Sequence, residues 1–116
     1  MRYVRITCLP VNAPDQRPIT VDAVLDDAQR IMGRYPLFGI WANLEHEADS
    51  YNPLVLRADG VLDYGDAFHA ESDRYCDFDL REGPIQVNRL LSYKSRDRRI
   101  VVSYLIDKIV DLPGAA

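Results

Sequence analysis

The sequence predicts an α+β fold: a curved, mostly antiparallel sheet of five to seven strands, with one amphipathic helix packed on one face. Short runs rich in β-branched and aromatic residues recur along the chain, as is typical of strands. One segment has helical spacing, and strands do not alternate with helices as they would in a parallel sheet. With 116 residues the chain is expected to form a single domain, because a chain of this length buries roughly two thirds of its surface on folding.

The helix is predicted over about residues 21–32. Thr20 is a good N-cap residue, and Ile19 and Val24 occupy the two positions of a hydrophobic staple. Apolar residues then recur every three or four positions, which predicts one buried face. Gly33 is placed to end the helix in the left-handed conformation.

The other apolar runs are predicted to be strands, and two of them form a long hairpin. Its arms are Ile85–Tyr93 and Ile100–Ile106, joined by the basic stretch Lys94–Arg99. Both faces of the second arm carry apolar side chains, so this arm is expected to be covered on both sides. A homodimer built on the open face of the hairpin is one hypothesis. Residues 104–112 also fit a helical period, and a strand is preferred because no N-cap precedes them.

Shorter strands are predicted at residues 3–9, 37–44, 53–58, 61–64 and 74–80. Asp59-Gly60 is a turn dipeptide and predicts a hairpin between the third and fourth of these. Cys8 and Cys76 have apolar neighbours in their strands and are predicted to be buried, reduced thiols. Residues 113–116 are predicted to form a frayed tail.

Composition limits the class of partner. The formal net charge is -4, so a nucleic-acid partner is not expected, because phosphate binding requires local positive charge. No apolar run approaches the roughly 18 residues of a membrane span, and no apolar leader follows Met1. These observations predict a soluble cytoplasmic protein without a membrane partner. The excess of arginine over lysine favours a bacterial source.

The first candidate site is the acidic loop at residues 63–73. Its potential metal ligands are Asp63, Asp66, His69 and Glu71. Carboxylate oxygens with one imidazole suit Mn, Fe or Zn, and such a site would make the protein a small metal-dependent hydrolase. The spacing matches no defined metal motif, and the alternative is an acidic loop that is simply solvated.

The second candidate is His46, which lies between Glu45 and Glu47. Neighbouring carboxylates raise the pKa of a histidine and suit it to acid–base catalysis near neutral pH. A turn histidine flanked by acids is more often only solvated. No catalytic residue and no cofactor are therefore assigned from the sequence.

Aromatic and basic side chains form the third candidate, an interaction surface. Its predicted members are Trp41, Tyr51, Tyr64, Phe68, Arg96, Arg98 and Arg99, and Tyr35 is a further loop aromatic. Tyrosine and tryptophan are favoured at protein interfaces, and a basic hairpin tip suits a phosphate or an acidic partner. The alternatives are that the aromatics cap the ends of the sheet and that the cations keep the hairpin soluble.

The sequence contains no catalytic or nucleotide-binding motif that we recognise. It therefore favours a non-enzymatic macromolecular interaction domain, with a protein partner or self-association as a homodimer. The metal-dependent hydrolase and a small-ligand binding protein are the alternatives.

Overall fold

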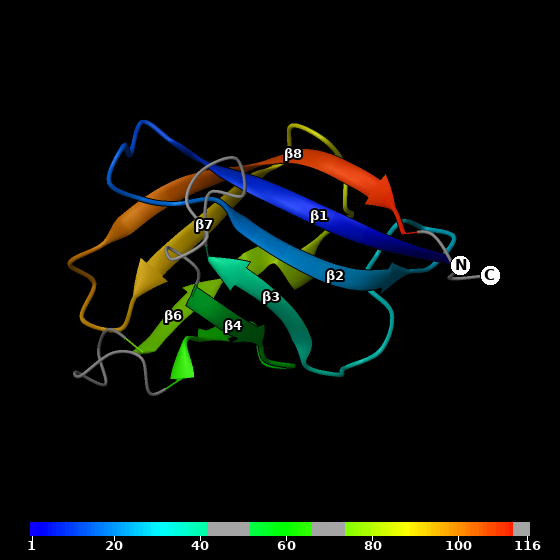
Figure 1. Ribbon diagram of the computed structural model, residues 1–116, viewed down its shortest axis with the longest axis horizontal. Helices are drawn as coiled ribbons and strands as arrows, with labels where there is room; N and C mark the ends of the chain where they lie inside the picture. Colours follow the sequence, from blue (N-terminus) through cyan, green and yellow to red (C-terminus); the bar gives the residue numbers. More distant parts are fainter. Residues whose placement is uncertain (42–51, 66–73, 113–116) are drawn as a thin grey trace.

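The computed structural model describes residues 1–41, 52–65 and 74–112. In these residues eight antiparallel strands close into a barrel, in which each strand pairs with the next and β8 returns to pair with β1 (Figure 1). The strands are β1 (Arg2–Val11), β2 (Ile19–Leu25), β3 (Leu37–Trp41), β4 (Asn52–Leu56), β5 (Val61–Asp63), β6 (Tyr75–Phe78), β7 (Leu90–Ser95) and β8 (Val101–Asp111). A short 3-10 helix, η3 (Asp79–Glu82), follows β6.

The predicted α+β fold is wrong, because the sheet has eight strands, is closed, and carries no helix at residues 21–32. The first part of that segment belongs to β2, which pairs with β1 over seven residue pairs. Ile19, Val21, Ala23 and Leu25 alternate with their neighbours and are all buried. The same residues fit a period of two, and the long pairing with β1 outweighs the local helical signal.

The turn after β2 accounts for the remaining helix signals. A helix over 21–32 would place Asp26 on its solvent face, whereas Oδ1 of Asp26 accepts hydrogen bonds from the backbone amides of Ala28 at 2.8 Å and Arg30 at 3.0 Å. Gln29 has a φ of 61° and Gly33 a φ of 72°. These left-handed residues reverse the chain instead of ending a helix.

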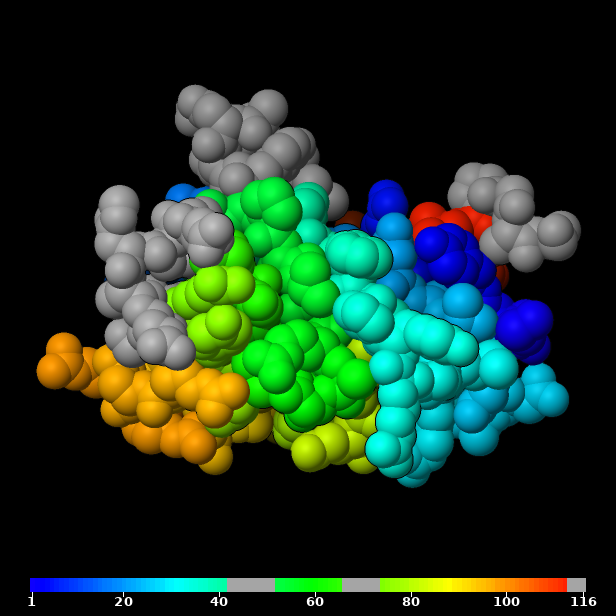
Figure 2. Space-filling view, turned by 90° about the horizontal axis from the view of Figure 1, so that it is seen from below, coloured from blue at the N-terminus to red at the C-terminus, as the bar shows by residue number. Residues whose placement is uncertain are grey.

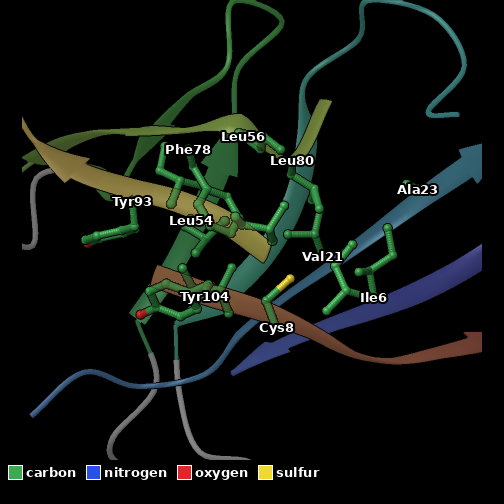
Figure 3. Close-up of a cluster of buried hydrophobic side chains, with 14 of the residues drawn as sticks. Ile6, Cys8, Val21, Ala23, Leu54, Leu56, Phe78, Leu80, Tyr93 and Tyr104 are labelled. Carbon is green, nitrogen blue, oxygen red and sulfur yellow. The ribbon is translucent and has the colours of Figure 1, made fainter. Parts of the chain in front are cut away.

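The hydrophobic core fills the inside of the barrel. Alternate residues of every strand point inward, as in other eight-stranded barrels whose interior is just wide enough for side chains. Figure 3 shows side chains from β1, β2, β4, β6, β7 and β8 converging on this space. The largest fully buried side chains include Ile6, Ile19, Leu25, Leu56, Leu62, Phe78, Leu80, Ile85, Tyr104 and Ile106.

One end of the barrel is closed by η3 and the segment that follows it. Leu80 and Ile85 are fully buried there. The guanidinium of Arg89 donates hydrogen bonds to the carbonyls of Asp79 at 2.8 Å, Leu80 at 3.3 Å and Pro84 at 2.8 Å. Backbone carbonyls at this end of the barrel therefore supply the hydrogen-bond partners of the Arg89 guanidinium.

The predicted hairpin is confirmed in its pairing and corrected in its extent. β7 and β8 are antiparallel neighbours, but the first arm begins at Leu90, and β8 continues as a strand to Asp111. The expectation that the second arm is covered on both sides is wrong. Val101, an outward side chain of this arm, is 62% exposed, and Val110 further along β8 is 53% exposed, because only the inner face of a barrel is covered.

Several local predictions are confirmed. β4 and β5 form the hairpin across Asp59-Gly60, and Gly60 has a φ of 88° that favours glycine. Cys8 and Cys76 are free and buried. Among the described residues, no helix has both the length and the apolarity that crossing a membrane requires. The predicted tail at 113–116 lies outside the described residues.

Candidate functional site

Tyrosines form a hydrogen-bonded cluster inside the barrel. The hydroxyls of Tyr64 and Tyr93 lie 2.9 Å apart, and the Cys76 thiol donates to the Tyr93 hydroxyl at 3.2 Å. The Tyr104 hydroxyl donates to the carbonyl of Arg17 at 2.8 Å. Each of these three tyrosine hydroxyls thus has a partner, which is what burial of a polar group requires.

The ionisation of this cluster is suppressed. Burial raises the pKa of Tyr64, Tyr93 and Tyr104 above the ordinary value for tyrosine. Burial also raises the pKa of the Cys8 thiol to about 12. A thiol that stays protonated at neutral pH is a poor nucleophile. These three tyrosines and Cys8 therefore stay protonated at neutral pH, and their role in the described part of the chain is to stabilise the barrel interior.

The outer wall carries an apolar concavity of about 570 Å³, on the part of the barrel where β3 ends its pairing with β2 while β1 and β2 remain paired. We call it the outer groove and define it by Tyr3, Val24, Met32, Tyr35 and Phe38, which line it. Tyr35 is 75% exposed and Phe38 is 70% exposed, and both Tyr3 and Met32 also have large exposed fractions. The groove is therefore open to a partner from solvent.

The groove exists because β2 and β3 separate. They pair only from Ile19–Trp41 to Val21–Gly39, after which β2 runs on to Leu25 without β3. The connecting chain then binds β2 itself, because the amide of Met32 donates to the carbonyl of Val24 at 2.8 Å. Met32 is thus brought beside Val24, and the two strands leave a gap between them that these side chains line.

Gly39 permits the close approach of β2 and β3 at the edge of the groove. A Cβ atom at this position would lie 2.1 Å from the carbonyl oxygen of Thr20. Any other residue would therefore push the strands apart. Because Gly39 is inward-facing like its partner Val21, the preceding Phe38 must point outward.

A second concavity of about 320 Å³ adjoins the groove and shares Phe38 with it. It is also lined by Val55 and Asp63. The register places Phe38 opposite Val55, Val55 opposite Asp63, and Asp63 opposite Tyr75. We call these four residues the outer row, which crosses β3, β4, β5 and β6. Figure 2 shows this face, from the cyan segment before β3 through green β4 and β5 to the orange β7–β8 turn.

Three arginines surround the last residue of the outer row. The guanidinium carbons lie 5.0 Å from the Tyr75 ring centre for Arg74 and 6.0 Å for both Arg57 and Arg96. A cation at such distances is attracted to the electron-rich face of the ring. We call these three side chains the arginine cluster.

Two members of the arginine cluster have carboxylate partners. Arg57 lies 2.8 Å from Asp59, and Arg74 lies 2.9 Å from Asp63. Among the described residues, no carboxylate lies within 4 Å of the Arg96 guanidinium. The described part of the cluster thus has one more cation than anion.

The predicted metal site is described only at Asp63. The Arg74 side chain donates to this carboxylate, as does the Gly65 amide at 2.8 Å, and the hydrogen bond from Arg74 is the largest cause of its lowered pKa. Asp66, His69 and Glu71 lie outside the described residues, as do Glu45, His46 and Glu47. No group of three or more metal-ligating side chains occurs in the described residues.

The aromatic residues predicted for an interaction surface do not all lie on the outside of the barrel. Tyr64 is only 4% exposed, so it belongs to the interior cluster and not to an exposed surface. Trp41 packs edge-on against Tyr64 at 5.7 Å, and Arg17 lies 4.8 Å from its ring centre. Tyr51 and Phe68 lie outside the described residues.

The arginines of the predicted basic tip have different partners. Arg98 pairs with Asp77 at 3.1 Å, and Arg99 approaches Asp97 at 3.7 Å. Arg96 instead reaches the Tyr75 ring. The tip therefore does not act as one block of positive charge, and Arg96 is the member that joins another feature of the surface.

Sequence reasoning missed most of the outer groove. The helical period over 21–32 places Val24 and Met32 on one buried face, and the period of two over 37–44 is compatible with Phe38 on the inward face of its strand. Leu37 and Phe38 are adjacent and both apolar, so the alternation alone does not say which of them points inward. The signal that could have decided it is Gly39, which needs the crowded inward position.

The fold defines an architecture, a small closed antiparallel barrel in which consecutive strands are neighbours. No family model, curated protein or solved structure matches the chain. The function must therefore be argued from the surfaces described above.

Proposed function

We propose that the protein binds a segment of another polypeptide through the outer groove. The observation that carries this proposal is the exposure of Tyr35 and Phe38 over one apolar concavity of about 570 Å³. Single exposed apolar residues are ordinary in folded proteins, whereas a contiguous group that lines a concavity is typical of an interaction site.

The shape of the surface favours a polypeptide over a compact ligand. The groove continues past Phe38 into the second concavity, over β3, β4 and β5. An elongated surface suits an extended chain that places one side chain in each hollow. Tyrosine and phenylalanine lose little conformational entropy on binding, because each has only two side-chain torsions.

The other functions considered have less support. The interior, where a small barrel holds a ligand, is lined here by packed side chains whose polar atoms bond to one another, such as those of Tyr64 and Tyr93. The metal-dependent hydrolase stays a prediction, because Asp63 is held by Arg74 and its other proposed ligands are not described.

A selection from random linear peptides displayed on phage tests the proposal, since it does not require the partner to be identified first. Selected peptides are then measured by fluorescence anisotropy against the wild type and Phe38→Ala. The control is Leu90→Ala, since Leu90 is 65% exposed on the outer face of β7, away from the groove.

The proposal expects peptides with an apolar or aromatic anchor. Their affinity falls about tenfold or more in Phe38→Ala, because a truncated hot-spot residue costs more than about 1 kcal/mol. The affinity changes less than about twofold in Leu90→Ala. The proposal is contradicted if no peptide is selected, or if the selected peptides bind Phe38→Ala as tightly as the wild type.

A further inference from the structure

The outer row connects the outer groove to the arginine cluster. Phe38 belongs to the groove, Val55 and Asp63 line the adjoining concavity, and Tyr75 stands among the arginines. The four residues are register neighbours on consecutive strands, so no strand intervenes between them. A chain that lies across the strands from the groove therefore reaches the arginine cluster.

The chemistry changes along this path. At Phe38 the wall is apolar and exposed. At Tyr75 it is aromatic and cationic, and Arg96 contributes a charge with no carboxylate within 4 Å in the described part of the chain. A planar guanidinium that projects beside an aromatic ring suits a carboxylate or phosphate oxygen, which accepts paired N–H bonds.

From this path we infer that the bound segment is acidic: besides its apolar anchor in the outer groove, it carries a carboxylate that binds Arg96 beside Tyr75. This inference rests on the proposed function and names the chemistry of its partner. A long polyanion such as a nucleic acid fits less well, because the net charge is -4 and Asp59 and Asp63 neutralise the other two arginines.

The strand spacing fixes the separation of the two groups. Three steps between neighbouring strands, from β3 to β6, span about 14 Å, and an extended peptide rises about 3.3 Å per residue. Residues two or four apart project from the same side of an extended peptide. The acidic residue is therefore expected four positions from the apolar anchor.

The same peptide selection, carried out in parallel on wild type and Arg96→Gln, tests the inference through the sequences it returns. On the wild type, aspartate or glutamate is enriched four positions from the anchor, and on Arg96→Gln this enrichment disappears while the anchor remains. Arg99→Gln is the control, because Arg99 is highly exposed at the same turn and is not part of the arginine cluster. Its selected peptides keep the acidic preference.

A double-mutant cycle then tests the pairing directly. Arg96→Gln and replacement of the peptide carboxylate by an amide each lower the affinity about threefold, the range of an exposed ion pair. The two changes together lower it no further than either alone, because the second has no partner left to lose. This coupling weakens at high salt.

The outcomes separate the two proposals. Two results overturn the inference and leave the proposed function standing. One is a set of selected peptides that need Phe38 but show no acidic preference. The other is a double-mutant cycle in which the loss of affinity from Arg96→Gln adds fully to the loss from the peptide amide. Peptides that do not need Phe38 overturn both. A wild type that sediments as a dimer, and becomes a monomer in Phe38→Ala, assigns the groove to a second copy and overturns the acidic partner.

Discussion

The aromatic residues inside the barrel and those on its outer wall have opposite surroundings. Tyr93 and Tyr104 are buried, and their hydroxyls hydrogen-bond to protein atoms. Tyr35 and Phe38 are mostly exposed, although they lie on an apolar concavity. Residues of one chemical kind thus stabilise the fold on one side of the wall and remain available for binding on the other. Substitutions on the two sides of the wall, and a rise in pH, are therefore expected to differ in their effect on stability.

The largest effect is expected inside the barrel, from Phe78→Ala. The Phe78 ring is 98% buried and packs edge-on against Tyr104 at 5.6 Å and Tyr93 at 6.1 Å. Its removal leaves a cavity between these rings and lowers the free energy of unfolding by about 3–5 kcal/mol. Urea denaturation measures this value. A loss below about 1 kcal/mol would show that this interior is not closely packed.

A smaller loss is expected from Tyr93→Phe, which removes one hydroxyl and keeps the ring. Tyr64 and Cys76 each lose a buried hydrogen-bond partner. The free energy of unfolding falls by about 1–2 kcal/mol. Tyr3→Phe is the matched control, because the Tyr3 side chain is exposed on the outer wall, and an unchanged urea midpoint is expected for it. Equal losses in both variants would contradict the division.

Alkaline pH is expected to weaken the barrel through its interior groups. The folded pKa of Cys8 is about 12, against an ordinary value of 9.0, so the unfolded chain releases this proton first. The contribution of the protonated Cys8 thiol to the free energy of unfolding is therefore fully present below pH 9. It falls as the pH rises towards 12, and the loss is about 1 kcal/mol at about pH 10. The buried tyrosines, whose pKa values are also raised, add to the loss above pH 10.

Thermal unfolding across this pH range checks the effect, with Cys8→Ala as the comparison. The variant lacks the contribution of the thiol, so its midpoint falls less steeply between about pH 9 and pH 10 than that of the wild type. Parallel curves for the two proteins would show that the thiol is not held in its protonated form by burial.

The smallest effect on stability is expected from Phe38→Ala on the outer wall. Because this side chain is 70% exposed, its truncation changes the free energy of unfolding by less than about 0.5 kcal/mol. Urea denaturation beside that of Phe78→Ala measures the contrast. A loss of several kcal/mol would mean that Phe38 stabilises the fold, and its effect on peptide binding would then be indirect.

The sequence predicted the strands well and their closure poorly. Segment 3–9 lies within β1, and segments 61–64 and 74–80 contain β5 and β6, because β-branched and aromatic residues alternate there. Closure depends on the pairing of β1 with β8, whose residues lie about a hundred positions apart. No local pattern encodes that contact, so an open sheet with a covering helix was the expected solution.

The prediction of a helix at 21–32 was wrong for a related reason. Thr20, Val24 and Gly33 match the start, the face and the end of a helix, but the same positions serve a strand and a turn. The sequence therefore did not predict the outer groove, because the helix face that carries Met32 was expected to be buried. Arg96 was predicted as an interaction residue from the basic tip alone, and its place beside Tyr75 follows from the register.

The central claim, that binding takes place on the outer wall, is tested most directly by NMR. Backbone amide shifts of the labelled protein are recorded during titration with a selected peptide. The account predicts that the largest changes occur at Met32, Tyr35, Phe38 and Val55 and extend to Tyr75 and Arg96. Largest changes at Leu9, Leu90 and Leu105, which are neighbours on the outer faces of β1, β7 and β8, would contradict it.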